Sequence, residues 1–172
     1  FEKSIQDSLI FLRYLMIPIC FYFIFFNKEH FLRYLLLLSM ALTFFVSIDT
    51  LFQFFSYTTI DGFGPDLFGF KSNWYGRLTG PFADELIPGS YISKFGLVGF
   101  VYFLIIKDFK YKNFFQTFYL SLILVTCFVS GERMAFATYL LALVLLFLFL
   151  NKERKILFKS ILVGIFCIIA IY

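Results

Sequence analysis

The feature that most constrains this sequence is a series of apolar runs, each close to the length that crosses a lipid bilayer. A spanning helix needs about 20 apolar residues, at a rise of about 1.5 Å per residue. Six runs come close to this length, at residues 9–26, 31–55, 86–106, 114–130, 134–150 and 156–172. Short polar connectors separate most of them, as they do in antiparallel helices. The sequence therefore predicts an all-α fold, a polytopic transmembrane helix bundle with about six spanning helices.

The composition agrees with a membrane protein. Hydrophobic residues make up 61% of the 172 residues, against roughly half in soluble domains. The net charge of +4 is scattered along the chain, which argues against a nucleic-acid partner and leaves the lipid bilayer as the expected environment. The three cysteines lie within apolar runs, so the sequence predicts neither a disulfide framework nor a metal site. We expect residues 1–172 to form a single membrane domain of a longer polypeptide.

The longest polar segment lies between the second and third runs, at residues 56–85. Six of the ten glycines and three of the four prolines fall between positions 61 and 89, a density typical of turns and close backbone approach. Aromatic and aliphatic side chains are spread through the segment, so it is not a disordered linker. We expect a compact outer loop at the membrane surface, with Trp74 and Tyr75 at the level of the lipid headgroups.

The basic residues predict the orientation, because lysine and arginine gather in cytoplasmic loops. Placing segments 27–33, 107–112 and 151–159 on one side collects nine of the 15 basic residues there: Lys28, Arg33, Lys107, Lys110, Lys112, Lys152, Arg154, Lys155 and Lys159. The other six are Lys3, Arg13, Lys71, Arg77, Lys94 and Arg133. The nine-residue side is therefore predicted to be cytoplasmic. This orientation places loop 56–85 and the turn 131–133 together on the outer face.

Two arginines of the predicted outer face are candidates for binding an anion. Arg77 lies in the loop, where a guanidinium stays charged and can hold a phosphate through two hydrogen bonds; the alternative is a solvated arginine or one paired with a lipid headgroup. Arg133 lies beside Glu132 in a short turn between apolar runs, where a charge near hydrocarbon is costly and usually functional. The alternative is that the Arg133 side chain extends to the membrane–water interface and binds no ligand. The sequence leaves both interpretations open.

The segment before the third run offers further polar candidates. Asp84 and Glu85 precede the run, where an acidic residue favours the positive end of a helix and Asp is a good N-cap. Pro88, Gly89 and Ser90 offer a competing start, with Ser90 as the cap and free amides in the first turn facing an anion. Lys94 follows Ser90 by one helical turn and would add a cation to the same site. Capping and ligand binding both remain open for these residues.

Three other ionisable residues, Asp49, Arg13 and His30, lie within or between the apolar runs. Asp49 falls about two turns from the end of the second run, and an intramembrane carboxylate is a functional candidate by default; its structural alternative is a salt bridge with Arg13 or Arg133. His30, the only histidine, lies in a predicted cytoplasmic turn, so we expect it to be absent from an outer-face site. No Ser-His-Asp set, metal-ligand spacing or nucleotide-binding glycine loop is present.

Two stretches together resemble one family of bacterial membrane glycosyltransferases, the O-antigen ligases and O-antigen polymerases. The first is residues 76–91, GRLTGPFADELIPGSY, which is similar to that family's outer-loop signature. The second is residues 130–136, SGERMAF, which is similar to its second arginine motif at a helix start. Residues 63–69, with their glycines and aromatic side chains, are similar to the segment just upstream. The resemblance covers about residues 50–150.

The resemblance implies a multi-helix fold of the GT-C type in the bacterial inner membrane, with a periplasmic active face and no metal or other cofactor. The donor would be a polyprenyl-pyrophosphate-linked glycan, and the acceptor another glycan or lipid A core. Arg77 and Arg133 would be the catalytic residues on the pyrophosphate, with Asp84, Glu85, Ser90, Lys94 and Glu132 in the substrate-binding region. The histidine that assists in ligases has no counterpart here, so the general base would come from Asp84, Glu85 or Glu132.

Two functions of different classes follow from these observations. The first is an inverting glycosyltransferase that polymerises or ligates lipid-linked glycan. The second is a transporter or flippase of lipid-linked sugars, which would also use arginines for phosphate. Transporters usually place polar groups near the bilayer midplane on broken helices. In a transporter, Asp49 and Arg13 would be these polar groups. The gathering of charges in the outer loop and turn favours the enzyme.

Overall fold

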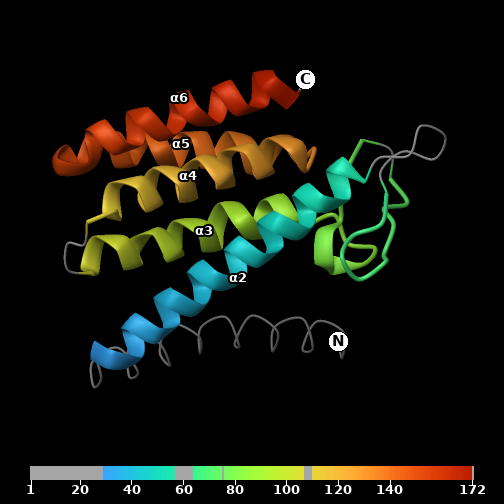
Figure 1. The fold of residues 1–172 in the computed structure, drawn as a ribbon, viewed down its shortest axis with the longest axis horizontal. Coiled ribbons are helices and arrows are strands. Elements are labelled where there is room, and N and C mark those ends of the chain that lie inside the picture. The colour runs from blue at the N-terminus through green and yellow to red at the C-terminus, as the bar shows by residue number, and fades with distance from the viewer. Residues whose placement is uncertain (1–28, 57–63, 75, 107–109, 172) are drawn as a thin grey trace, which may run out of the picture. The chain divides into compact units, whose positions relative to one another are not determined.

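The computed structural model describes residues 29–56, 64–74, 76–106 and 110–171 (Figure 1). Within them, five α-helices follow one another: α2 (Glu29–Phe55), α3 (Pro88–Ile105), α4 (Lys112–Val129), α5 (Arg133–Phe149) and α6 (Arg154–Ile171). Two short 3-10 helices lie at Gly80–Phe82 and Asn151–Glu153. No strand forms in these residues beyond an isolated bridge between Pro65 and Lys71. The all-α prediction is confirmed for the described part of the chain.

The number of membrane spans is lower than expected. Three helices of the described residues are long and apolar enough to cross a bilayer alone, at Phe31–Phe55, Pro88–Ile105 and Lys112–Val129. The fifth and sixth predicted runs become α5 and α6, which form a pair bent by 107° and count at most as one further span. Helix α5 has only 17 residues, about 25 Å of rise. The described residues thus hold three or four candidate spans rather than six separate ones, and run 9–26 lies outside them.

Residue contacts divide the chain into two units, Phe1–Leu35 and Leu36–Tyr172. Of the first unit, only the beginning of α2 is described. Everything below concerns the second unit.

Helix α4 forms the centre of this unit and packs against α3, α5 and α6. Its buried apolar residues include Leu120, Ile123, Leu124 and Cys127, which share one hydrophobic core with residues of α2, α3, α5 and α6. Tyr139 of α5 is also fully buried, and its hydroxyl donates a hydrogen bond of 3.0 Å to the carbonyl of Leu120. This bond satisfies the one polar group of a large side chain in the core.

Helix α2 packs closely against α3. A side chain at position 99 would meet the backbone of Met40 at 2.8 Å, so the glycine allows the two helices to approach. One turn away, the hydroxyl of Ser39 donates to the carbonyl of Phe95 at 2.9 Å. Small residues and polar contacts of this kind hold helices together in membranes, where burial of apolar surface between helices adds little.

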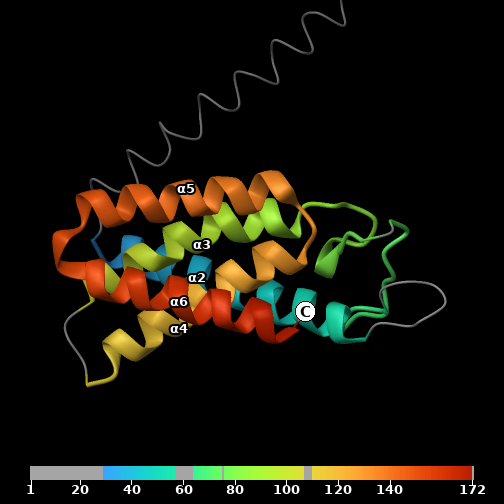
Figure 2. The same ribbon diagram turned by 90° about the horizontal axis from the view of Figure 1, so that it is seen from above.

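The elements that carry the candidate site meet at one end of the helices (Figures 1 and 2). There lie the end of α2, the loop that leads to α3, the start of α3 and the turn between α4 and α5. The connections from α3 to α4 and from α5 to α6 lie at the opposite end. We call the first of these the loop end. The prediction that loop 56–85 and turn 131–133 share one surface is confirmed for the described part of the loop.

Candidate functional site

The loop end carries a pocket lined by both predicted arginines. It has a volume of about 490 Å³ and is lined by Gly76, Arg77, Gly131, Glu132, Arg133 and Met134. A second hollow of about 430 Å³ shares most of these residues and adds Phe128 and Phe136. We call the two together the arginine pocket. Both guanidinium-bearing residues are exposed, and within the described residues neither forms an ion pair with a carboxylate.

Backbone contacts bring the two arginine segments together. The amide of Leu78 donates a hydrogen bond of 3.1 Å to the carbonyl of Ser130. Gly131 has a φ of +77°, which favours glycine, and a side chain here would clash with the carbonyl oxygen of Gly76. The Cβ would also lie 3.4 Å from the Cα of Arg77. Glycine at position 131 therefore allows the turn between α4 and α5 to lie directly against the arginine of the loop.

Gln53, in the last turn of α2, holds the loop just beyond Arg77. Its side-chain oxygen accepts hydrogen bonds from the amides of Thr79, at 3.0 Å, and Gly80, at 2.8 Å. Its side-chain nitrogen donates to the hydroxyl of Thr79 at 3.2 Å and to the carbonyl of Phe70 at 3.4 Å. Gln53 is fully buried, so each bond satisfies a group that would otherwise be costly. This amide fixes the path of the backbone two residues after Arg77.

Asp49, one turn earlier on α2, also holds the loop. Its Oδ1 accepts a hydrogen bond of 2.8 Å from the amide of Leu67. The neighbouring Asp66 folds the loop locally, because its Oδ1 accepts from the amides of Phe68 and Phe70 at 3.0 and 2.7 Å. In the described residues Asp49 makes no ion pair with Arg133, and Arg13 lies outside them. Asp49 is therefore part of the loop's anchorage.

Glu132 binds the first turn of α3. Its two carboxylate oxygens accept hydrogen bonds from the amide of Gly89 at 2.8 Å, the amide of Ser90 at 3.1 Å and the hydroxyl of Ser90 at 2.6 Å. A carboxylate at a helix N-terminus is favourable because the free amides there carry partial positive charge. The anion that the first turn of α3 was expected to face is thus supplied by the chain itself.

The predicted caps of α3 need correction. The helix begins at Pro88, and its N-cap residue, Ile87, has no side-chain cap. Neither Asp84 nor Ser90 occupies the cap position, since proline at the first helical position sets the start and Glu132 satisfies the amides from across the fold. Position 89 must be small for this contact, because a Cβ there would lie 3.1 Å from the Cβ of Glu132.

The remaining predicted site residues lie on the surface. Asp84 is exposed and accepts a hydrogen bond of 3.1 Å from the side-chain amide of Asn73. Glu85 is exposed as well, and so is Lys94, one helical turn after Ser90 on α3. None of these three lines the arginine pocket. The structure thus brings together Arg77, Arg133 and Glu132, with Ser90 bonded to Glu132.

Sequence reasoning missed Gln53 and Asp66. The side-chain amide of Gln53 lies among apolar residues near the end of run 31–55. An amide is costly to bury without hydrogen-bond partners, and this cost was the signal that could have identified Gln53. Asp66 lies in a Gly- and Pro-rich stretch and gave only the general signal of a turn residue.

The described residues contain no group of three or more His, Cys, Asp or Glu side chains placed to hold a metal ion. Comparison with protein-family models, with curated proteins and with solved structures gives no match to this chain.

Proposed function

We propose that the protein is a membrane glycosyltransferase that takes a glycan from a polyprenyl pyrophosphate carrier and joins it to an acceptor hydroxyl. The reaction would polymerise the glycan or ligate it to lipid A core. The site would face the periplasm from the bacterial inner membrane, in line with the distribution of basic residues. The residues that carry the proposal are Arg77 and Arg133.

The observation that supports it most is the shared pocket of these two arginines. They come from different segments of the sequence, yet they line one hollow and have no carboxylate partner in the described residues. The carboxylate that lines the same pocket, Glu132, is already bonded to the first turn of α3. The pocket therefore keeps excess positive charge. Guanidinium groups pair with phosphate oxygens in a planar, two-bond geometry, so a pyrophosphate is a fitting anion.

In this proposal the arginines act on the leaving group. The acceptor oxygen attacks the anomeric carbon from the face opposite the carrier and loses its proton to a base. The bond from that carbon to the pyrophosphate oxygen breaks with its electron pair. Arg77 and Arg133 stabilise the negative charge that develops there, an effect typically worth several kcal/mol in a preorganised site. Because Glu132 accepts three hydrogen bonds, the exposed Asp84 and Glu85 are the better candidates for the base.

A transporter of lipid-linked sugars is the second candidate, and one observation favours it. The bent pair of α5 and α6 resembles the broken helices on which transporters place their binding sites. The break, however, lies at Asn151–Glu153, at the opposite end of the helices from the arginine pocket (Figure 1). Asp49, which a transporter would use near the midplane, bonds to the amide of Leu67. These positions favour the enzyme.

The test compares cells that make surface glycan with the wild-type protein and with Arg77→Ala or Arg133→Ala. We expect both variants to lose the glycan ladder on a gel and to accumulate lipid-linked single units on the outer face of the membrane. Lys71→Ala is the matched control, because Lys71 is an exposed cation of the same loop that does not line the pocket.

Three outcomes would contradict the proposal. A normal ladder from either arginine variant at equal expression would remove that residue from the reaction. Accumulation of lipid-linked units on the inner face would instead support the transporter. Loss of the ladder in Lys71→Ala as well would show that loop charge in general, and not the pocket, matters.

A further inference from the structure

A tight turn at residues 65–71, in the loop that leads to α3, exposes three large apolar side chains. They are 49%, 60% and 49% exposed, in the order Leu67, Phe68 and Phe70. An antiparallel bridge between Pro65 and Lys71 closes the turn, and the amide of Asp66 donates a hydrogen bond of 2.9 Å to the carbonyl of Phe70. We call residues 65–71 the hairpin. Neighbouring apolar side chains that a fold leaves exposed indicate an interaction surface.

A ring contact places the tip of the hairpin against a candidate spanning helix. The ring of Phe68 lies 6.0 Å from the ring of Phe45 of α2, centroid to centroid, in an edge-to-face arrangement. Phe45 lies inside the candidate span Phe31–Phe55 and is itself exposed. It precedes the last residue of α2 by ten positions, which corresponds to about 15 Å of rise. The hairpin therefore continues the exposed apolar surface of α2.

The packing of α2 on α3 gives the level of this contact. A Cβ added at Gly96 would lie 3.3 Å from the Cγ2 of Thr43, so these two residues are level with each other. Phe45 is two positions nearer the loop end than Thr43, and therefore lies about 9 Å inside the start of α3 at Pro88. The ring of Phe68, in contact with Phe45, thus lies within the length of a second candidate span.

The backbone of the hairpin is suited to an apolar medium. Five consecutive amides donate to acceptors within the protein, those of Asp66, Leu67, Phe68, Gly69 and Phe70. The buried carboxylate of Asp66 accepts two of these bonds, that of Asp49 accepts one, and carbonyls of the turn accept the other two. An amide without an acceptor is costly in lipid, where no water can replace the bond. The hairpin thus exposes apolar side chains and keeps its amides bonded.

We propose that the hairpin enters the bilayer leaflet at the loop end and anchors the loop there, with the side chains of Leu67, Phe68 and Phe70 among the lipid chains. Lys71, the last residue of the hairpin, is exposed and can extend to headgroup phosphates. Trp74, three residues later, is exposed as well and suits the headgroup level. The partner of this surface is the lipid bilayer, because the hairpin is continuous with the exposed apolar side of α2.

Gln53 connects the hairpin with the arginine pocket. Its side-chain nitrogen donates to the carbonyl of Phe70 at 3.4 Å, and its oxygen accepts from the amides of Thr79 and Gly80, which follow Arg77. Lipid contact that holds the hairpin therefore also holds the backbone next to Arg77. The anchor itself does not depend on the proposed glycosyl transfer, since no carrier or acceptor takes part in it.

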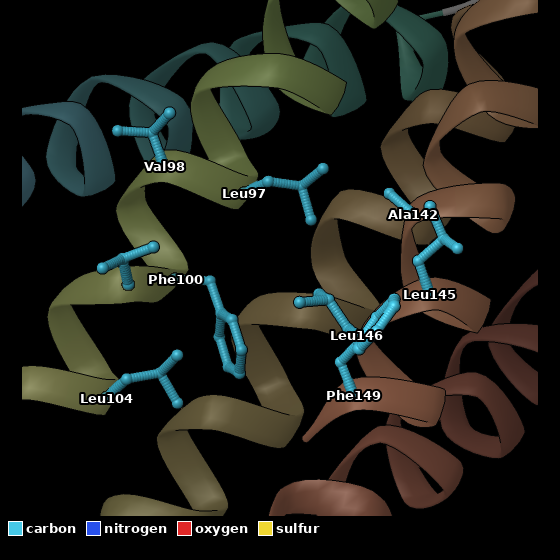
Figure 3. A pocket seen from close by; sticks show the side chains of 9 residues that line it. Leu97, Val98, Phe100, Leu104, Ala142, Leu145, Leu146 and Phe149 are labelled. Atoms are coloured by element: carbon cyan, nitrogen blue, oxygen red, sulfur yellow. The ribbon is translucent and has the colours of Figure 1, made fainter.

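The experiment places one tryptophan at a time in the full chain in lipid nanodiscs. Trp74 is the only tryptophan of the sequence, so Trp74→Phe provides a background without one. In this background, Phe68→Trp reports on the hairpin. Val98→Trp, at an exposed position beside the apolar groove between α3 and α5, reports from within the candidate span Pro88–Ile105 (Figure 3). Lys152→Trp reports from an exposed polar turn. Quenching by bromine on the lipid chains and by iodide in water is measured for each.

We expect bromine to quench Phe68→Trp at least half as strongly as Val98→Trp, and iodide to quench it at least threefold less than Lys152→Trp. Strong quenching by iodide without quenching by bromine would place the hairpin in water and overturn the proposal. Protection from both quenchers would mean that a protein surface, such as a second copy of the chain, covers the hairpin, and would overturn the lipid assignment as well.

A second pair of variants tests the anchor with Trp74 in place. Phe68→Glu puts a charge where lipid is expected, whereas Phe68→Leu keeps an apolar side chain. We expect hydrogen exchange at the amides of Leu67 and Phe70 to be at least tenfold faster than in the wild type for the glutamate variant, and within threefold for the leucine variant. Equal exchange in the two variants would overturn the anchor, and so would an equal rise throughout the buried helix α4.

Discussion

The side-chain oxygen of Gln53 lies 2.8 Å from the amide nitrogen of Gly80, in one of the hydrogen bonds that join the end of α2 to the loop that carries Arg77. The same oxygen also accepts a hydrogen bond from the amide of Thr79, and the side-chain nitrogen donates to the hydroxyl of Thr79 and the carbonyl of Phe70. The position of Arg77 therefore depends on a helix that contributes no residue to the arginine pocket.

Replacing Gln53 with leucine should loosen the loop and lower stability. The amides of Thr79 and Gly80 would lose their buried acceptor, at roughly 1–3 kcal/mol for each group left unsatisfied. Gln53→Glu keeps an acceptor for both amides but loses the two donated bonds, so we expect a smaller loss. Thermal unfolding and hydrogen exchange at residues 78–80 measure both effects. Exchange in Gln53→Leu as slow as in the wild type would show that the side chain does not hold the loop.

Replacing Glu132 with alanine should open the first turn of α3. Three donors, the amides of Gly89 and Ser90 and the hydroxyl of Ser90, would lose their acceptor. We expect destabilisation of roughly 2–4 kcal/mol, since the lost bonds are made to a charged group. Glu85→Ala, which removes an exposed carboxylate of the same region, should change stability by less than about 0.5 kcal/mol. Equal unfolding temperatures for the two variants would contradict this role of Glu132.

Gly131→Ala should separate the two arginine segments. The change adds strain at a positive φ and a clash with the carbonyl of Gly76. Gly76→Ala is the matched control, because its φ is +71° but nothing lies within 4 Å of an added Cβ. The control should show only the strain, about 1 kcal/mol or slightly more. Unfolding temperatures and pyrophosphate affinity measure the difference, and identical behaviour of the two variants would mean that the close contact is unimportant.

Arg77 and Arg133 should act together on one ligand. In a double-mutant cycle of pyrophosphate binding, we expect a coupling energy of about 0.5–3 kcal/mol between Arg77→Ala and Arg133→Ala, as for residues that share a partner. Lys152→Ala, at the opposite end of the helices, should combine additively with Arg77→Ala. Additive effects of the two arginines would indicate that they bind separate ions.

The orientation of the chain predicts which exposed positions react from each side of the membrane. In a background without the native cysteines, Lys71→Cys at the loop end should be labelled by an impermeant maleimide added outside. Lys152→Cys, between α5 and α6, should react only after the membrane is made permeable. Both side chains are exposed, so a lack of labelling would not be due to burial within the protein. The reverse pattern would invert the predicted orientation.

The sequence predicts the helices well because their signal is local. Run 86–106 corresponds to α3 at Pro88–Ile105, and run 114–130 to α4 at Lys112–Val129. The bend between α5 and α6 could not be predicted in this way, because an apolar run indicates the length of a helix and not the direction of its axis. A turn at Asn151–Glu153 has the same polar composition whether the chain crosses the membrane again or folds back.

Of the site, only the charged residues could be predicted from the sequence. A guanidinium near hydrocarbon is conspicuous in any sequence, so Arg77 and Arg133 could be found and placed on one surface. The acceptors that hold the surrounding backbone could not be assigned, because their partners are distant: Glu132 reaches Gly89 across 43 positions and Gln53 reaches Gly80 across 27. Local capping rules favoured Asp84 or Ser90 for a role that Glu132 fills through tertiary structure.

Gln53 and Glu132, the two side chains that hold the backbone near the arginines, are synthesised at different times. Gln53 precedes the segment it holds, so the loop after Arg77 can take its shape as soon as it leaves the ribosome, since chains fold from the N-terminal side during translation. Glu132 follows Gly89 by 43 positions, and the first turn of α3 has no internal acceptor for its amides until α4 and the turn beyond it have been inserted. A chain stalled before that turn would carry one arginine in place and an uncapped helix beside it.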